Sequence, residues 1–206
     1  MAAFFANLRN TVIAGFVLAL LVFVLAWQTG MLNGTTFWPF FMRWLHVVCG
    51  VMWIGLLWYF NFVSTPTMPK IPAELKPALG KFITPAALFW FRWAALATIV
   101  LGIGLASIYH YLLPALTLDA VEGFSDPKSI VIGIGMWLGI VMGFNVWFVI
   151  WPNQQRALNI DNRFPDLPQP QKDAAAKTAA MFSRINTMLS VPMLFCMVGA
   201  THMLSG

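Results

Sequence analysis

Charged residues are scarce in this chain of 206 amino acids. Only 9% of its residues are Asp, Glu, Lys or Arg and 60% are hydrophobic, whereas about a quarter of the residues in an ordinary soluble domain are charged. The apolar segments run nearly end to end and leave no polar stretch long enough to fold a second core. The composition predicts an integral membrane protein with one domain over residues 1–206.

Other absences narrow the function. None of the long apolar segments contains a carboxylate, and no motif pairs a nucleophile with a base. We therefore expect no hydrolytic chemistry, and the remaining candidate functions are redox chemistry and ligand binding. The net charge of +5 comes from basic residues spread over short loops, which does not predict a nucleic-acid partner. The two cysteines, Cys49 and Cys196, both lie inside apolar runs, so we expect no structural disulfide.

The apolar segments have the length of membrane spans. Windows of about 20 apolar residues, enough to cross the hydrocarbon core, alternate with turn-forming segments. They predict an all-α fold, a polytopic membrane bundle of five transmembrane helices. No small-x-small cleavage pattern follows the first window, so we expect it to be retained as a span. The predicted helices cover residues 10–28, 38–63, 85–113, 129–152 and 182–204.

Lysine and arginine in the short loops predict the orientation. Cytoplasmic loops carry an excess of these residues, and only Lys128 lies in the opposite set of loops. We therefore expect a bacterial inner-membrane protein with a cytoplasmic N-terminus and a periplasmic C-terminus, with the lipid bilayer as its first partner. The residues on the cytoplasmic side are Arg9, Lys70, Lys76, Lys81, Arg156, Arg163, Lys172 and Lys177.

Polar residues inside the predicted spans separate into two depths. Such residues are costly in a bilayer and usually face a bundle interior, a cavity or a cofactor. The outer layer holds all three histidines, His46, His110 and His202. The inner layer holds Asn61, Arg92, Asn145, Arg184 and Asn186.

The outer layer predicts a heme b site. On the second span Arg43, His46 and Gly50 follow helical spacing and share a face. A heme between helices needs an axial histidine, small residues beside it and a cation for its propionates. We expect His46 as an axial ligand and His110 or His202 as its partner, because the three histidines share one depth. Arg92 and His110 are five helical turns apart, as are Arg184 and His202, so each pair shares a face. Two alternatives stay open: a three-histidine copper or zinc site, and histidines that only pack near helix ends.

The inner layer predicts a substrate site. Arg92 and Arg184 supply donors that stay charged, and Asn145 and Asn186 supply paired donor and acceptor groups. Together they suit a planar, electron-rich or anionic molecule such as a purine or a quinone head group. The alternative is that both arginines reach to lipid phosphates.

Three stretches resemble a known family. "MRWLHVVCGVMWIGLLWYFNF", "GFNVWFVIWPNQQ" and "SRINTMLSVPMLFCMVGATHM" are together similar to the N-terminal membrane domain of bacterial membrane-bound urate oxidases (urate hydroxylases). The resemblance implies a redox-linked membrane domain. Positions that match the family motifs are His46, Asn145, Asn153, Arg184, Asn186 and His202.

The same resemblance sets the functional expectation. In the full-length enzymes a cytochrome c domain follows, but this chain ends at Gly206 without a Cys-x-x-Cys-His motif, so we expect a stand-alone form. It would bind heme and pass electrons between a purine or quinol and an external acceptor, such as a cytochrome c or another respiratory subunit, and it could act as a homo-oligomer. The alternative is a non-catalytic accessory subunit of a larger membrane complex.

Overall fold

The computed structural model describes residues 2–202, except for the side chains of residues 2, 3 and 201. All regular structure in this range is helical, which confirms the predicted all-α fold. Five helical segments within the described residues are long and apolar enough to cross a membrane, so the protein is an integral membrane protein. These segments are Leu8–Gln28, Phe37–Lys70, Lys76–Ile108, Pro127–Leu158 and Gln169–Ala200.

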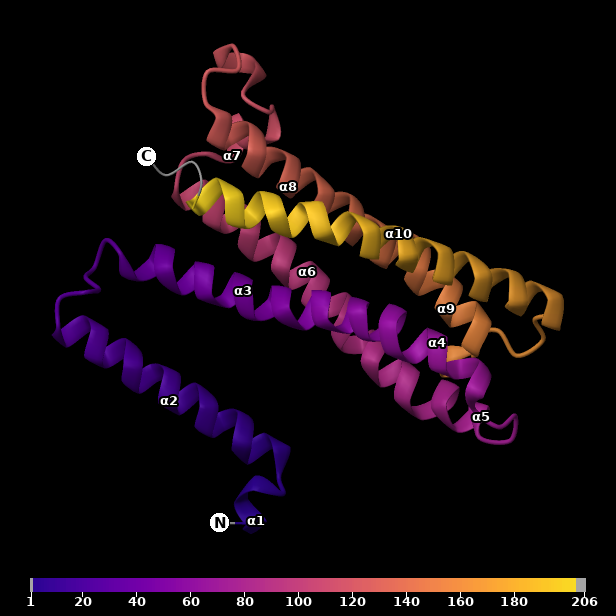
Figure 1. Ribbon diagram of the computed structural model, residues 1–206. Helices are drawn as coiled ribbons and strands as arrows, with labels where there is room; N and C mark the ends of the chain where they lie inside the picture. Colours follow the sequence, from indigo (N-terminus) through magenta and orange to yellow (C-terminus); the bar gives the residue numbers. More distant parts are fainter. Residues whose placement is uncertain (1, 203–206) are drawn as a thin grey trace. The chain divides into compact units, whose positions relative to one another are not determined.

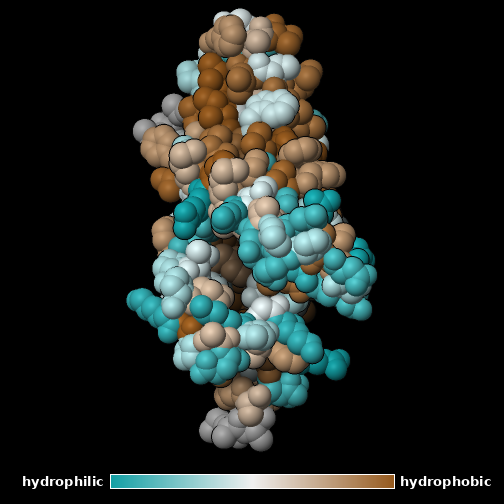
Figure 2. Space-filling model, turned by 90° about the vertical axis from the view of Figure 1, so that its right-hand side faces the viewer, coloured by the Kyte–Doolittle hydropathy of each residue, from teal (hydrophilic) through white to brown (hydrophobic). Residues whose placement is uncertain are grey.

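The last four segments are longer than a bilayer requires. Each contains 32 to 34 residues, or roughly 50 Å of helix at 1.5 Å per residue, whereas the hydrocarbon core is about 30 Å thick. The predicted helices missed this excess, because the second ended at residue 63 and the fifth began at residue 182. The additional turns are rich in polar residues, and Figure 2 shows hydrophilic side chains gathered around the ends of α5 (Lys76–Ala78), α9 (Trp151–Leu158) and α10 (Gln169–His202).

The chain divides into two compact units, Met1–Met42 and Arg43–Gly206. The first contains α1 (Ala2–Phe5), α2 (Leu8–Gln28) and the beginning of α3 (Phe37–Trp58). The side chain of Asn7 caps α2 by accepting from the Arg9 amide at 3.0 Å. The ring of Phe23 lies 5.7 to 6.0 Å from the rings of Phe37, Phe40 and Phe41, and this edge-to-face cluster closes the hairpin.

The second unit is a bundle of the other four spans (Figure 1). Along its first two spans α3 continues into short helical pieces that lead to α6. Its other two spans consist of α8 with α9, and of α10 alone. Besides the helices already defined, the elements are η1 (Tyr59–Ser64), α4 (Thr65–Thr67), η2 (Met68–Lys70), η3 (Leu79–Ile83), α6 (Thr84–Ile108), α7 (Leu112–Leu116), η4 (Ala120–Glu122), α8 (Pro127–Phe144), η5 (Asn145–Ile150) and η6 (Ile160–Asn162).

Three of these pieces, η1, η3 and η5, are π-helical. Each is followed by a helix with proline at its second position, namely Pro66, Pro85 and Pro152. Proline has no amide hydrogen and its ring clashes with the carbonyl four residues earlier, which in each case lies inside the π segment. The wider π turn accommodates the ring, so each span bends at the proline without ending.

Glycines on α8 set its contacts with neighbouring helices. A Cβ added at Gly135 would lie 2.9 Å from Cys196 Cβ on α10, and one at Gly143 would overlap the side chain of Ile99 on α6. Such close approach supplies the van der Waals contact that holds helices together in lipid. Gly135 and Gly143 thus lie directly against neighbouring helices, while nothing lies within 4 Å of such a Cβ at Gly139.

Candidate functional site

His46 packs against α6 at one end of the bundle. Its ring lies on Gly102, where an added Cβ would come within 2.9 Å of His46 Cε1 and 3.2 Å of Nδ1. Nδ1 is 2.8 Å from the backbone carbonyl oxygen of Thr98. The Thr98 hydroxyl donates to the Ala94 carbonyl at 2.7 Å, so His46 bonds to the backbone of Thr98 and not to its side chain. Thr98 and Gly102 thus form the seat of His46.

This contact assigns the protons of the imidazole. A carbonyl oxygen only accepts hydrogen bonds, so Nδ1 must carry the hydrogen and donate it to Thr98. In the neutral ring Nε2 then holds a lone pair, and it makes no hydrogen bond to any described residue. An Nδ1–H held by a backbone carbonyl is the usual way in which proteins orient a metal-binding histidine. The predicted iron ligand His46 therefore has a free ligating nitrogen.

Arg43, one turn before His46, lies beside aromatic rings at the end of α6. Its guanidinium carbon is 5.0 Å from the ring centroid of Tyr109, within the range of cation–π attraction. The ring of Tyr109 stacks on Tyr111 at 6.4 Å. Burial raises the pKa of Tyr111, and the positive charge of Arg43 partly opposes this. The cation predicted for a propionate is thus at the same end as His46, and the structure describes no carboxylate that pairs with it.

Two further features of α3 fit a bound heme. Gly50, one turn after His46, leaves space beside α6, since an added Cβ would meet only Thr98 Cγ2 at 3.8 Å. Trp53 follows on the same face and is 1% exposed, yet its indole Nε1 has no hydrogen-bond partner among the described residues. A buried donor without a partner is costly unless a ligand or water completes it. The residues around His46 therefore offer a free imidazole nitrogen, a cation and an unpaired indole donor, which are groups that a heme site uses.

His110 differs from the prediction because α6 ends at Ile108, not at residue 113. His110 has a φ of +59°, its amide donates to the Ser107 carbonyl, and the Tyr111 amide donates to the Ala106 carbonyl, each at 3.1 Å. These are the two bonds of a Schellman motif, whose left-handed position is usually glycine. Because His110 lies outside the helix, the five-turn spacing from Arg92 does not place it on the predicted face.

His202 is the last residue of α10 and is exposed. The helix passes through Pro192 without a break. Within residues 2–202 no group of three or more histidine, cysteine or acidic side chains is arranged to hold a metal ion. The copper or zinc alternative with His46, His110 and His202 therefore receives no support from the arrangement of these side chains.

The inner asparagines bond to each other between helices. Asn145 Nδ2 donates to Asn186 Oδ1 at 2.9 Å, and Asn186 Nδ2 donates to the Met142 carbonyl at 2.9 Å. Asn145 is 7% exposed and Asn186 is fully buried. Their polar groups therefore join α8 and η5 to α10 and do not line an open site.

Two more bonds connect α10 to the second span. Asn61 Nδ2 donates to Ser183 Oγ at 2.8 Å, and Trp58 Nε1 donates to Ser190 Oγ at 2.9 Å. With Asn186, these serines form one polar stripe at helical spacing along α10. Asn153, a residue that matches the family motifs, donates to the Val149 carbonyl of its own helix at 2.8 Å.

Arg92 is surrounded by aromatic rings. Its guanidinium carbon lies 3.7 Å from the centroid of a Trp151 ring and 5.5 Å from that of Phe89, and its backbone carbonyl accepts from Trp147 Nε1 at 3.1 Å. The face of the guanidinium is thus covered, while its N–H donors bond to no described residue. Arg184, by contrast, is exposed on α10. The structure therefore does not bring the four predicted substrate residues into one pocket.

Comparison with known proteins identifies no family for this chain. The chain matches no protein-family model, no curated protein and no solved structure. The functional argument therefore rests on the side chains described above.

Sequence reasoning missed the residues that complete these contacts. Thr98 and Gly102 are small residues four apart, but the same span also contains Ala94, Ala95, Ala97 and Gly104, so the sequence did not single out the seat of His46. Ser183 and Ser190 flank Asn186 at helical spacing, which is a recognisable pattern for helix association. Nothing in the sequence identified Trp151 as the partner of Arg92, since that pairing depends on which helices are neighbours.

Proposed function

We propose that this protein is a heme-binding redox protein of the membrane, related to the membrane domain of the bacterial urate oxidases. The observation that carries the proposal is the bond between His46 Nδ1 and the Thr98 carbonyl. It presents Nε2 as a ligand in the tautomer that heme iron requires. A heme held there would supply one-electron chemistry.

The surrounding residues have distinct tasks in this proposal. The Thr98 carbonyl orients the imidazole, and Gly102 admits it against α6. Arg43 would neutralise a propionate, with Tyr109 holding its guanidinium in place. Since His110 terminates α6, His202 would be the remaining histidine that could bind the iron together with His46. In the proposed orientation this end faces the periplasm, where an external cytochrome could accept electrons.

The inner layer has no place in this function. Asn145 and Asn186 are engaged with each other, so a purine site built from them would first have to break bonds between helices. We therefore limit the proposal to heme binding and electron transfer at the outer end, with the electron donor still to be identified.

Absorption spectroscopy tests the proposal. The protein, expressed with an adequate heme supply and purified in detergent, is expected to show a Soret band, which His46→Ala abolishes or shifts. Lys128→Ala, in the first turn of α8, is the control and should leave the band unchanged. A porphyrin-free preparation, or a band that His46→Ala does not alter, would contradict the proposal.

A second candidate is an accessory subunit without redox chemistry. The observation that favours it is the set of bonds from α10 to its neighbours, because they give the inner polar residues a purely structural task. A subunit of this kind would be colourless when purified and would remain in its native complex after His46→Ala. Heme retained by the isolated chain and lost in that variant would exclude it.

A further inference from the structure

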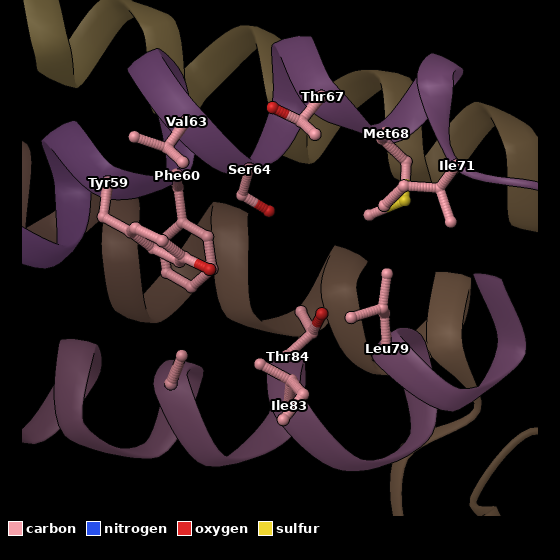
Figure 3. Close-up of a pocket in the computed structure, with 11 residues that line it drawn as sticks. Tyr59, Phe60, Val63, Ser64, Thr67, Met68, Ile71, Leu79, Ile83 and Thr84 are labelled. Atoms are coloured by element: carbon pink, nitrogen blue, oxygen red, sulfur yellow. The ribbon is translucent and has the colours of Figure 1, made fainter. Parts of the chain in front are cut away.

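A cleft of about 110 Å³ lies between the two arms of the first hairpin of the bundle. One wall comes from η1, α4 and η2, and the other from η3 and the first turn of α6. Two π segments therefore face each other across it (Figure 3). π turns are rare and frequently occur at functional sites. The cleft is at the end of the bundle opposite to His46.

The walls are mostly apolar but carry hydroxyl groups without partners. Tyr59, Ser64, Thr67 and Thr84 line the cleft, and their hydroxyls make no hydrogen bond to any described residue. Figure 3 shows the hydroxyls of Ser64 and Thr84 pointing into the space between the arms. Ser64 and Thr84 are half-buried, and a hydroxyl both donates and accepts, so the cleft has unused hydrogen-bonding capacity.

These hydroxyls behave differently from others in the spans. Thr98, Ser107 and Thr187 donate to the carbonyl four residues earlier at 2.7 to 3.1 Å, as serine and threonine commonly do in helices. Ser64 and Thr84 adjoin the π segments and make no such bond. They therefore remain available to a ligand.

The chemistry of the walls defines the ligand. None of the described residues that line the cleft is charged, so an ion such as urate or a phosphate would be desolvated there without a counter-charge. Val63 and Ile83 lie in the cleft walls and are 51% and 54% exposed, so the cleft is open at the surface of the bundle. The volume approaches the roughly 150 Å³ cavity that encloses one benzene ring. A neutral ligand that carries hydrogen-bonding oxygens therefore suits these walls best.

We propose that this cleft binds the head group of a membrane quinone and of the corresponding quinol. A hydroxyl both donates and accepts, so Ser64 and Thr84 can donate to the carbonyls of the quinone and accept from the hydroxyls of the quinol. An acyl chain would satisfy neither hydroxyl. The inference rests on the proposed redox function for the choice of ligand class, but binding itself needs no heme.

Quinone titration tests the site. The purified chain in phosphatidylcholine nanodiscs is titrated with a short-chain benzoquinone and with its reduced form, and binding is followed by tryptophan fluorescence and by equilibrium dialysis. We expect saturable binding of one molecule per chain in both states. Ser64→Ala combined with Thr84→Val should weaken it at least tenfold. Thr65→Val, a neighbouring exposed position that does not line the cleft, should leave the affinity unchanged.

Two controls separate this inference from the heme proposal. His46→Ala should bind quinone normally, so a colourless protein that binds quinone would overturn the heme site alone. Circular dichroism confirms that the double variant folds, and Thr84→Ser, which keeps the hydroxyl, should retain binding. Quinone affinity that the double variant does not change overturns the quinone site. If the double variant loses co-purified phospholipid instead, the cleft is a lipid site and the quinone site is likewise overturned.

Discussion

The imidazole of His46 lies between the Thr98 carbonyl, 2.8 Å from Nδ1, and the backbone of Gly102. The carbonyl selects the tautomer and the glycine supplies the room, so α6 determines both the orientation and the chemistry of the histidine on α3. The heme proposal depends on this pair of contacts more than on the histidine alone.

Gly102→Ala should therefore disturb His46 directly. The new Cβ would lie 2.9 Å from Cε1, so the ring must move and lose its bond to Thr98, and overpacking of this kind costs about 1–3 kcal/mol. We expect a lower thermal midpoint in detergent and an altered Soret band. Gly55→Ala on α3 is the matched control, because nothing lies within 4 Å of its Cβ. Equal behaviour of the two variants would contradict the proposed seat.

His110→Gly should stabilise the protein. A non-glycine residue in the left-handed region costs roughly 1–2 kcal/mol, and His110 has a φ of +59°, so thermal unfolding should move to higher temperature. The Soret band should be unchanged. Loss of heme in this variant would instead make His110 an axial ligand and restore the original expectation.

Asn145→Ala should weaken the contact between α10 and η5. The substitution leaves Asn186 Oδ1 buried without its donor, and hydrogen bonds between membrane helices are worth about 0.6–1.7 kcal/mol. Denaturation in mixed micelles measures the loss. Adding Asn186→Ala should cost less than the sum of the two single changes, whereas the exposed Gln171→Ala should be nearly neutral. Full additivity would show that the two side chains do not interact.

The thermal stability of the protein should depend on pH through Asp126. It caps α8, and the hydrogen bond from the Ser129 hydroxyl, with those from the Lys128 and Ser129 amides, lowers the pKa of this carboxyl. The stabilisation by the ionised Asp126 cap is fully present above the ordinary Asp pKa of about 3.9. It is lost as the pH falls through the lower pKa of this carboxyl in the folded protein.

The measurement is a series of thermal midpoints from pH 6 to pH 3. Asp126→Ala should lose about 1 kcal/mol at pH 6. Asp126→Asn should keep most of the cap and remove this part of the acid dependence, because asparagine caps without titrating. An acid profile that Asp126→Asn does not change would show that other groups determine it.

The sequence by itself determined the membrane class, the five spans and the positions of the polar residues along them. Each of these follows from the length and local composition of one segment, because these two properties decide whether that segment can span a bilayer, whatever the rest of the chain does. The helical spacing of Arg43, His46 and Gly50 is equally local, since α3 is regular there. The end of α6 was misplaced because a left-handed cap at His110 is seldom formed by histidine, so its residue type did not indicate it.

Only the tertiary structure decided which polar residues meet. Asn145 and Asn186 were assigned to the same layer, yet their pairing depends on the contact between η5 and α10. Thr98 became the partner of His46, and Trp151 that of Arg92, because α6 lies beside both α3 and α9. Periodicity within one helix gives the direction of a side chain from its own axis. Which helix faces that side chain follows from close packing around Gly102, Gly135 and Gly143, and the spacing along one segment does not contain that information.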